Sequence, residues 1–400
     1  MPLKPPLALF DTLEQVKLTQ VSHPYPDDLQ QAIEFIYQYR GSHATFNAYR
    51  REIERLLQWS AHIAKKSLQH LKQNHIEAYL QFCQAPPDEW IALKKCDRFI
   101  TQEGLRKPNP YWRPFVASQS KAARKMGHTI AKHNYHLSAK ALQAIFAILS
   151  SFYNYLIERD YLAYNPVNQI RQKSKFIRSS QQRAPVRRLS ELQWSYVIET
   201  AEGMANNNLE HERTLFIMNA LYAMYLRISE LATSARWQPT MKDFFRDYDG
   251  NWWFRTVGKG NKERQIVVST AMLNALKRYR ESLQLSPLPD AMDHTPLLSK
   301  KRGKGRLTST RHIRDIVQSC FDKAIQRMQM DGFNDEAREL QAATVHWLRH
   351  TGISEDVKHR PREHVRDDAG HGSSAITDRY IDVELRQRHE SGKNKAIKPT

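Results

Sequence analysis

The stretch ATVHWLRHTGIS, residues 342–353, places three polar side chains, His346, Arg349 and His350, in an otherwise largely apolar segment. Residues three and four apart lie on one face of a helix, so a helix here would bring these side chains together. Such a face needs polar partners, because burying polar groups without hydrogen bonds costs free energy. The stretch therefore predicts a helix that contributes to a polar site.

Zinc is a poor candidate for that site. His346 and His350 have the spacing found in zinc proteases, but that motif requires glutamate where this sequence has Trp347. No carboxylate cluster accompanies the histidines, and the three cysteines form no Cys-x-x-Cys pair. The pattern His-x-x-Arg is weak evidence alone, since HRPR at 359–362 matches it too. We expect a site without metal or cofactor.

The charge of the chain indicates the class of its ligand. Among 400 residues, 61 are Lys or Arg and 42 are Asp or Glu, which gives a formal net charge of +19. An excess of this size favours binding to a polyanion, and its clustering argues against a general solubilising role. Residues 1–25 lack a continuous apolar signal region, and no apolar run approaches the ~18 residues of a membrane span. We expect a soluble, cytoplasmic protein.

The first half of the chain is expected to form a helical domain. After an irregular N-terminal arm at 1–24, apolar residues recur at helical spacing through 25–170. Residues 101–135 depart from this pattern, with seven Lys or Arg, one Glu and three prolines. That segment is either a solvated insertion loop or a loop along a DNA phosphate backbone, and the sequence leaves both open.

A basic linker at 171–189 leads to a second domain at 190–400, with Ser190 as a helix N-cap. Helical spacing dominates this domain too. One segment, NWWFRTVGKGNKERQIVVS at 251–269, instead has two β-rich runs around a glycine-containing turn. The predicted fold class is mainly α: a helical N-terminal domain, and a mixed, mostly helical domain with a small antiparallel β-sheet.

Polar residues that could form one site with His346, Arg349 and His350 lie in segments before and after residues 342–353. LRISEL and GKGNKER precede it, and AGHGSSAITDRYIDV follows it. Each segment also has an ordinary structural explanation. LRISEL could hold an ion pair, GKGNKER could be a surface hairpin, and the tyrosine of the third segment could be a packed aromatic residue. Their joint occurrence in this order argues against those explanations. The polar members are Arg227, Glu230, Lys259, His371 and Tyr380.

In this order, and together with HWLRHTG, the motifs resemble those of the tyrosine recombinase, or phage integrase, family over about 185–385. More loosely, ATFNAYRREIERLLQW and the helices up to residue 170 are similar to that family's DNA-clamping core-binding domain. The resemblance implies a bacterial, nucleoid-associated site-specific recombinase or integrase that acts as a tetramer. The implied partners are double-stranded DNA with specific recombination sites, further copies of the chain, and accessory DNA-bending or directionality proteins.

Phosphodiester chemistry explains the choice of residue types. Arginine binds phosphate through two fixed donors and has no proton to lose, so Arg227 and Arg349 suit a clamp on the scissile phosphate. Tyrosine has an ordinary pKa near ~10 and is a poor nucleophile without nearby cations. By the resemblance, Tyr380 forms a 3′-phosphotyrosine bond. Such a bond conserves the energy of the phosphodiester, so religation requires neither metal nor ATP.

The resemblance also assigns the supporting residues. Lys259 is implied as the general acid for the 5′-oxygen, with Lys262 in the same turn as a rival. Glu230 is implied to support the first arginine. His346 and His371 would hydrogen-bond the phosphate or the nucleophile, and the sequence does not assign the base that takes the tyrosine proton.

Other basic residues are expected to contact DNA, and the tail at 381–400 is a candidate for docking on a neighbouring protomer. The expected DNA contacts are Arg50, Arg51, Lys121, Arg124, Lys173, Lys175, Arg178, Lys262 and Arg264.

The resemblance is incomplete in places. Tyr225 and Ala369 stand where the family usually has glycine and leucine, and EDVKHRPREHVRDD at 355–368 is unusually charged. Three alternatives follow. A type IB topoisomerase-like or telomere-resolving enzyme would use the same chemistry, and a catalytically silent DNA-binding protein would have no use for Tyr380. A metal-dependent nuclease lacks its carboxylate cluster.

Overall fold

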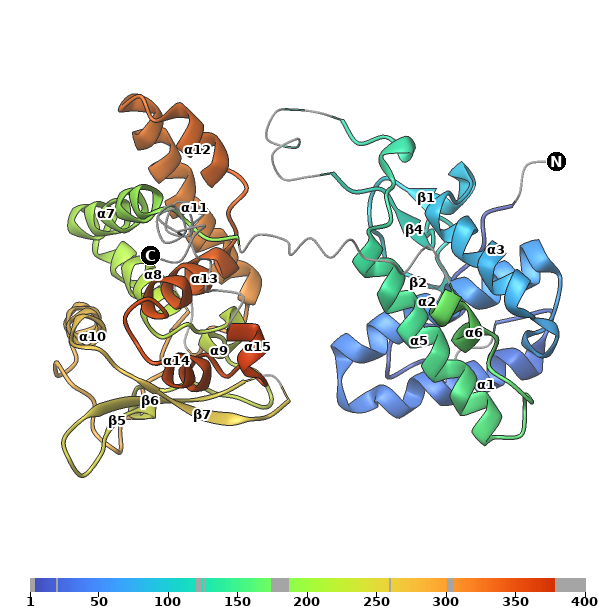
Figure 1. The fold of residues 1–400 in the computed structure, drawn as a ribbon, viewed down its shortest axis with the longest axis horizontal. Helices are drawn as coiled ribbons and strands as arrows, with labels where there is room; N and C mark the ends of the chain where they lie inside the picture. The colour runs from blue at the N-terminus through green and yellow to red at the C-terminus, as the bar shows by residue number, and fades with distance from the viewer. Residues whose placement is uncertain are drawn as a thin grey trace, which may run out of the picture. The chain divides into compact units, whose positions relative to one another are not determined.

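The structure, a computed structural model, describes residues 4–18, 21–119, 124, 127, 129–173, 187–258, 260–300 and 305–377, without the side chains of 169, 171–173, 374 and 375. The chain divides into two compact units, Met1–Arg183 and Ala184–Thr400 (Figure 1), and each is described by itself. Five residues singled out from the sequence lie outside the described residues: Lys121, Lys175, Arg178, Lys259 and Tyr380.

The first unit is built on two long helices, α2 (His43–Trp59) and α5 (Ala139–Glu158), which pack against each other and against α1 (Pro26–Tyr37). Each long helix begins at a serine, Ser42 or Ser138, whose hydroxyl accepts a backbone N–H of the first turn. Their apolar stripes are buried in one core, as the helical spacing predicted. The unit also contains α3 (Gln73–Gln84), α6 (Pro166–Lys173) and short helical turns at Gln38–Gly41, Ser60–Ala64, Leu68–His70, Asp88–Trp90 and Lys132–Asn134.

The first residues of this unit are packed into it. Leu9 and Phe10 are buried in the helical core, and the Leu9 N–H donates to the buried Glu54 Oε1 at 2.7 Å. The Asp11 carboxylate accepts two hydrogen bonds from Arg106, at 2.8 and 2.6 Å. The segment expected as an N-terminal arm is therefore irregular but is held by the rest of the unit.

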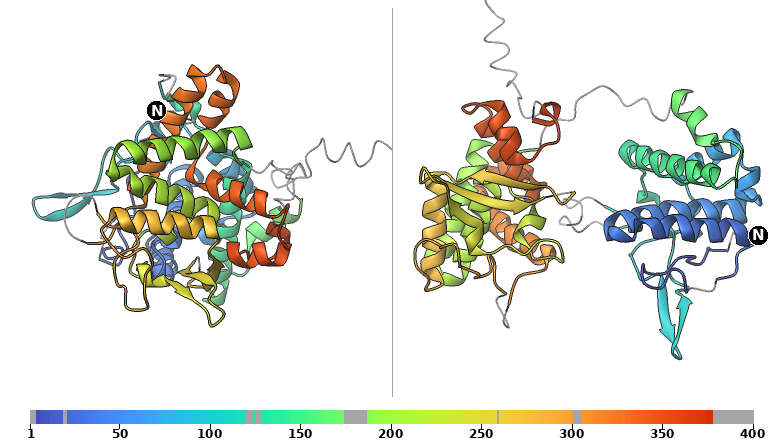
Figure 2. Two further views of the ribbon diagram at one scale, coloured as in Figure 1. Left: turned by 90° about the vertical axis from the view of Figure 1, so that its left-hand side faces the viewer. Right: turned by 90° about the horizontal axis from the view of Figure 1, so that it is seen from below.

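Residues 101–135, expected to be a loop, contain regular structure. β2 (Phe99–Gln102) and β3 (Leu105–Pro108) form an antiparallel hairpin that extends away from the helices (Figure 2). Its turn at 103–104 has two positive φ angles, +53° and +76°, the geometry that tight hairpins favour. The prediction of a loop was wrong for residues 101–108, because the Glu103-Gly104 pair forms a hairpin turn in a segment whose prolines and charges suggested irregular structure. A second pair, β1 (Ile91–Ala92) and β4 (Phe115–Val116), is parallel.

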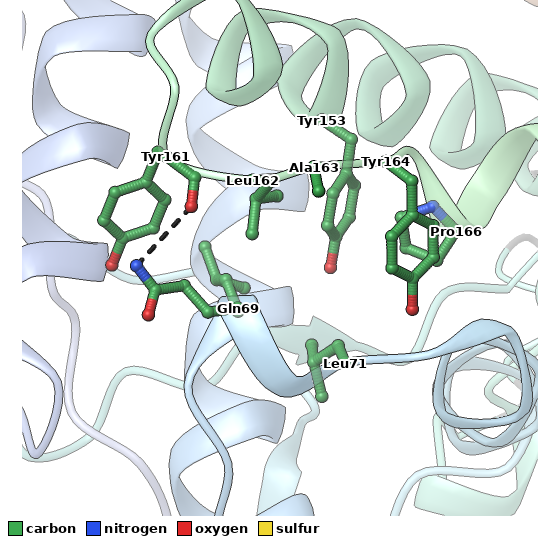
Figure 3. A pocket seen from close by; sticks show the side chains of 9 residues that line it. Gln69, Leu71, Tyr153, Tyr161, Leu162, Ala163, Tyr164 and Pro166 are labelled. Atoms are coloured by element: carbon green, nitrogen blue, oxygen red, sulfur yellow. Dashed lines mark hydrogen bonds between the residues drawn. The ribbon is translucent and has the colours of Figure 1, made fainter.

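A pocket of the first unit lies between residues 68–71 and the segment that follows α5 (Figure 3). Tyr153, Tyr161 and Tyr164 line it, and Gln69 Nε2 donates to the Tyr161 carbonyl at 3.5 Å. None of its nine lining residues, all in the described part of the chain, is charged. The pocket therefore has no cation with which to bind a phosphate.

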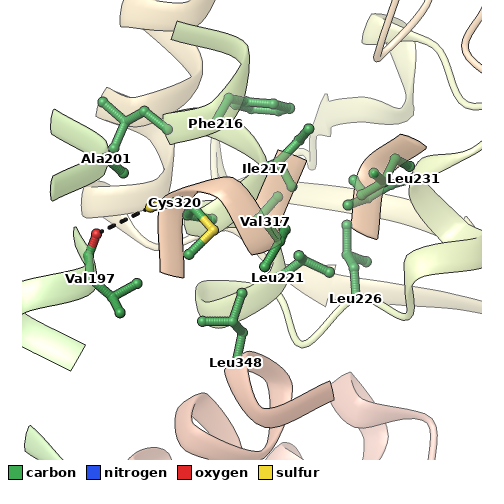
Figure 4. Packing of buried hydrophobic residues seen from close by; sticks show 14 of the residues in the cluster. Val197, Ala201, Phe216, Ile217, Leu221, Leu226, Leu231, Val317, Cys320 and Leu348 are labelled. Atoms are coloured by element: carbon green, nitrogen blue, oxygen red, sulfur yellow. Dashed lines mark hydrogen bonds between the residues drawn. The ribbon is translucent and has the colours of Figure 1, made fainter. Parts of the chain in front are cut away.

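The second unit is centred on α8 (Glu212–Ala223). This helix packs against α7 (Glu191–Asn207), α10 (Thr270–Ser282), α11 (Thr310–Met330) and α13 (Val345–Asp356). Figure 4 shows the resulting core, where apolar side chains from α7, α8, α11 and α13 meet. Helix α13 contains the HWLRHTG motif, so this core holds the helical part of residues 342–353 in place.

A three-stranded antiparallel sheet completes the second unit. Its strands β5 (Phe244–Arg246), β6 (Trp252–Val257) and β7 (Glu263–Val267) pair in that order, and α14 (Arg362–Ala369) packs against β7. β6 and β7 are the two runs predicted within 251–269, which confirms the predicted mainly α fold with a small sheet. No helix in the described residues is long and apolar enough to cross a bilayer. The remaining elements are α9 (Ile228–Leu231), α12 (Asn334–Leu340), α15 (Ser374–Thr377) and turns at Leu209–His211 and Met241–Asp243.

Gly352 provides a test of how closely α13 packs on α8. A Cβ at this position would lie 2.1 Å from the Tyr222 carbonyl oxygen, so only glycine fits. We expect Gly352→Ala to destabilise the second unit by at least ~2 kcal/mol, because overpacking forces the backbones apart. In calorimetry of the full chain, one unfolding transition should fall by about 4 °C or more.

Gly203 on α7 is the matched control, because a Cβ there would meet no atom within 4 Å. Gly203→Ala should leave the same transition unchanged or raise it slightly, since alanine favours helix. A Gly352→Ala protein as stable as the wild type would contradict the close packing of the two helices.

Candidate functional site

Arg227, Arg349 and His371 meet at one turn of the second unit. Arg227 Nη2 donates to the Gly370 carbonyl at 3.3 Å, and Arg349 Nη2 donates to the adjacent Ala369 carbonyl at 2.5 Å. His371 follows directly in the chain. Two guanidinium groups from separate elements and an imidazole are thus neighbours, as the order of the motifs suggested.

Glu230 holds the first of these arginines. Arg227 precedes α9, and Glu230 in the first turn accepts its backbone N–H at 2.7 Å and its Nη1 at 3.1 Å. The same carboxylate accepts Arg264 Nη1 and Nη2 at 2.7 and 2.8 Å. The Glu230 side chain is 1% exposed, Arg264 is 10% exposed and Arg227 is 26% exposed. Of the two arginines on this carboxylate, Arg227 therefore reaches furthest into solvent.

The charge of Glu230 follows from its surroundings. Burial raises the pKa of this carboxyl, but hydrogen bonds and positive charge from Arg264, then from Arg227, outweigh burial and leave the pKa below its ordinary value. Glu230 is consequently ionised at neutral pH. One buried negative charge faces two arginines, which leaves an excess of positive charge at the site.

Helix α13 positions the second arginine. Leu348 is fully buried in the core (Figure 4), which fixes the rotation of the helix and turns Arg349 toward the site. Arg349 is 4% exposed, and its Nη1 donates to the Tyr225 carbonyl while Nη2 donates to that of Ala369. Backbone oxygens on both sides therefore set the plane of this guanidinium group.

Histidines surround the two arginines. The His346 and His350 rings lie on one face of α13 with centroids 6.3 Å apart, and His371 Nδ1 is 2.9 Å from Thr377 Oγ1. Burial, and then the charges of Arg349 and Arg227, lower the pKa of His371 to about 4. Burial, and then His346 and Arg349, lower the pKa of His350 to about 4. Both imidazoles are therefore neutral at pH 7, and a neutral imidazole can accept a hydrogen bond at its unprotonated nitrogen.

The hairpin between β6 and β7 reaches this cluster through Gly258. A Cβ on Gly258 would lie 3.0 Å from Glu230 Oε1 and 3.3 Å from Arg227 Nη1, so the backbone passes directly against the ion pair. The Gly258 N–H donates to the Lys262 carbonyl at 2.8 Å. Lys259, expected as general acid, is the next residue after Gly258 and lies outside the described residues, as does Tyr380.

The residues expected to contact DNA differ in their exposure and in their hydrogen-bond partners. Arg51, Arg124 and Lys262 are exposed. Arg50 Nη2 instead donates to Asn47 Oδ1 at 2.6 Å. The expectation that Arg264 contacts DNA is corrected. Its side-chain donors are used by Glu230 and, at 2.9 Å, by the Asp368 carbonyl, so it lies inside the site and not on a free surface. The side chain of Lys173 is not described, and Lys121, Lys175 and Arg178 lie outside the described residues.

A second ionic cluster, which the sequence patterns did not predict, lies next to Arg349 and is formed by Tyr225, Asp356, Arg360 and Asp368. The signal was present, since three of these residues belong to the unusually charged run at 355–368. That run was noted only as a departure from the family pattern. Within the described residues, no group of three or more His, Cys, Asp or Glu side chains is placed to hold a metal ion.

Residues 187–386 match the model of the phage integrase family, and residues 29–94 match that of the phage integrase N-terminal SAM-like domain. The chain is 26% identical over 172 residues to tyrosine recombinase XerC of Haemophilus ducreyi, covering 43% of this chain and 50% of the relative. It is 29% identical over 162 residues to tyrosine recombinase XerD of Rickettsia prowazekii, covering 40% and 47%. The chain thus spans about half the length of these curated relatives.

The fold is similar to that of XerH site-specific recombinase, solved bound to a palindromic difH substrate as a post-cleavage complex. The TM-score is 0.53 at 13% identity, covering 96% of this chain and 93% of that one. At this identity the similarity concerns the fold.

The buried Glu230 cluster generates a prediction about stability and pH. Glu230→Gln removes the counter-ion of the buried Arg264, so we expect a loss of about 3 kcal/mol at pH 7. Because the pKa of Glu230 is lowered in the folded state, its stabilisation is complete above the ordinary value of 4.5 and is lost as pH falls through the folded pKa. Urea unfolding between pH 7 and 3.5 should show the difference from wild type shrinking below about pH 4.5.

Glu263→Gln, on β7 next to Arg264, is the control. That carboxylate is 59% exposed and its ion pair with Arg255 is 3.4 Å long, so the change should be within about 0.5 kcal/mol. A Glu230→Gln effect that is equally small, or that grows as pH falls, would contradict the assigned role.

Proposed function

Because the chain belongs to the phage integrase family, we propose that it is a site-specific DNA recombinase that cleaves and rejoins DNA through a 3′-phosphotyrosine intermediate. The observation that carries this proposal is the meeting of Arg227 and Arg349 at the carbonyls of Ala369 and Gly370, directly before His371. Two guanidinium groups held by fixed acceptors form a preorganised cation site for one phosphate.

In the proposed reaction, the Tyr380 hydroxyl attacks the phosphorus and loses its proton, and the bond from phosphorus to the 5′-oxygen breaks. Lys259 gives the departing 5′-oxygen its proton. Arg227 and Arg349 neutralise charge that grows on the non-bridging oxygens. Each transfer exchanges one phosphate ester for another, so neither metal nor ATP is required.

The histidines of the site are the candidates for the group that receives the tyrosine proton. Burial, followed by neighbouring positive charge, lowers the pKa values of His371 and His350 to about 4, so each is unprotonated at pH 7 and can accept a hydrogen bond. A bound phosphate would offset the arginine charges and so make uptake of a proton less costly. His371 is the stronger candidate for the base, because it adjoins the turn that receives both arginines. His346, on the same face of α13 as His350, would bind the phosphate or its leaving group.

The proposed substrate is double-stranded DNA with a specific recombination site. The net charge of +19 supports a polyanionic partner, and the structurally similar XerH was solved with a DNA substrate. Exchange of strands requires two duplexes, so the working assembly would be a tetramer in which a 5′-hydroxyl of one duplex attacks the phosphotyrosine of the other. Accessory DNA-bending proteins are a further proposed class of partner.

Covalent trapping tests this proposal. A nicked duplex carrying a binding site selected with the protein would be incubated with it in EDTA and analysed on a denaturing gel. A covalent protein–DNA adduct should form, because loss of the short strand at the nick prevents religation. Tyr380→Phe should abolish the adduct while retaining DNA affinity within about twofold, since only the nucleophile is removed.

Three outcomes separate the alternatives. An adduct that persists in Tyr380→Phe would place the nucleophile elsewhere. Tight, specific DNA binding without any adduct would favour the catalytically silent binder. An adduct that requires a divalent metal would contradict the metal-free mechanism.

The general acid can be assigned with a modified leaving group. Lys259→Ala should slow cleavage of the ordinary substrate by roughly 10²–10⁴-fold, the usual contribution of such a group. A sulfur in place of the bridging 5′-oxygen should restore the rate, because a thiolate leaves without a proton. Single-turnover rates on both substrates measure this.

Lys262→Ala is the matched control within the same turn and should respond equally to the two substrates. The opposite pattern, with sulfur rescuing only Lys262→Ala, would assign the acid to Lys262.

A further inference from the structure

Tyr225 has a backbone conformation that tyrosine rarely adopts. Its φ is +50°, in the left-handed region that favours glycine, and its side chain is 1% exposed. The left-handed conformation costs a residue with a Cβ roughly 1–2 kcal/mol. Contacts of the buried side chain must offset this cost, so those contacts indicate what the tyrosine does.

The hydroxyl of Tyr225 belongs to an ionic network. It donates to Asp356 Oδ2 on α13, and Arg360 Nη1 donates to the Tyr225 hydroxyl oxygen and to Asp356 Oδ2, each at 3.0 Å. Arg360 Nη2 donates to Asp368 Oδ2 on α14 at 2.6 Å. Asp368 Oδ1 in turn accepts the N–H of Val267 on β7 at 3.4 Å. The network therefore joins the segment before α9 to α13, α14 and β7.

The ring of Tyr225 occupies a small apolar cluster with Ile353, Val365 and Ala369. This cluster is separate from the main core of the unit. It lies between α13 and α14, and it includes Ala369, the last residue of α14. Ring and hydroxyl thus fasten Tyr225 to both helices.

Burial, then the Asp356 carboxylate, raises the pKa of Tyr225. The hydroxyl consequently keeps its proton and acts as a hydrogen-bond donor. These conditions are unsuited to a nucleophile, which must lose that proton.

The network ends at two backbone carbonyls that accept hydrogen bonds from Arg349. The guanidinium group is held by the carbonyls of Tyr225 and Ala369, both members of the apolar cluster, and Asp368 immediately precedes Ala369. Displacing either carbonyl would rotate the guanidinium group.

We propose that Tyr225 is a positioning residue for Arg349: through Asp356, Arg360 and Asp368 its hydroxyl fixes the two backbone carbonyls that orient the Arg349 guanidinium group. This inference rests on the proposed function, in which Arg349 binds the scissile phosphate. Misplacement of a phosphate-binding group by about 1 Å lowers rates by about 10²-fold, so small shifts in these carbonyls matter.

The test measures single-turnover cleavage of the nicked substrate together with equilibrium DNA affinity. Tyr225→Phe retains the ring and removes the hydroxyl, so cleavage at saturating protein should fall about tenfold or more with DNA affinity unchanged within about twofold. Arg360→Lys retains the charge but loses the planar fork whose two terminal nitrogens reach Asp356 and Asp368 separately, so it should cause a comparable loss. Tyr279→Phe is the control, because Tyr279 is equally buried, stacks on Phe216 and lies outside the network.

A double-mutant cycle separates positioning from general structural support. If Tyr225 acts through Arg349, Tyr225→Phe should have little further effect on cleavage in an Arg349→Lys protein. Equal effects in both backgrounds, unchanged cleavage in Tyr225→Phe, or a parallel loss of DNA affinity would overturn the inference. Absence of any adduct with wild-type protein would instead overturn the proposed function, and the role of Tyr225 with it.

Discussion

The buried carboxylate of Glu230 is the interaction on which the arrangement of the site depends. It accepts hydrogen bonds from the backbone and side chain of Arg227 and from both terminal nitrogens of Arg264. Arg264 in turn donates to the Asp368 carbonyl at the end of α14. One side chain thus ties α9, β7 and α14 together. Because burying ions is costly, such a cluster contributes more to geometry than to net stability.

The same cluster explains the electrostatic character of the site. Two arginines, Arg227 and Arg264, share the single charge of Glu230, so this cluster carries an excess of positive charge. The lowered pKa of His371 reflects burial first and then this positive charge, which disfavours a further proton. A phosphate would compensate the excess, which is why the proposed reaction needs no metal ion to balance its transition state. The site is thus arranged before its ligand arrives.

Sequence patterns predicted the parts whose cause is local. Helical stripes and serine caps gave the long helices, and Ser190 accepts the N–H of Gln193 at 3.1 Å as an N-cap should. Motif order singled out Arg227, Arg349 and His371, which the structure brings together at one turn; their catalytic roles stay a prediction. Arg264 was misjudged, since a basic residue in a basic hairpin gives no local sign that its partner is a buried carboxylate. The Tyr225 network could not be predicted from the sequence, because it joins residues more than 130 positions apart and depends on the left-handed backbone conformation of Tyr225.

The positioning role proposed for Tyr225 accounts for a tyrosine at a position where glycine would be expected. Glycine would adopt its backbone conformation at lower cost but would leave the carbonyl that receives Arg349 without a side-chain anchor. Tyrosine adds that anchor, and a buried hydroxyl then requires partners, which the charged run at 355–368 supplies. Two departures from the family pattern, an unexpected tyrosine and an unusually charged helix, thereby have one physical explanation. The Arg360 guanidinium group pairs with both carboxylates of the network, Asp356 and Asp368, while neutral backbone carbonyls hold Arg349, so the network reaches Arg349 without placing a carboxylate on it through these contacts.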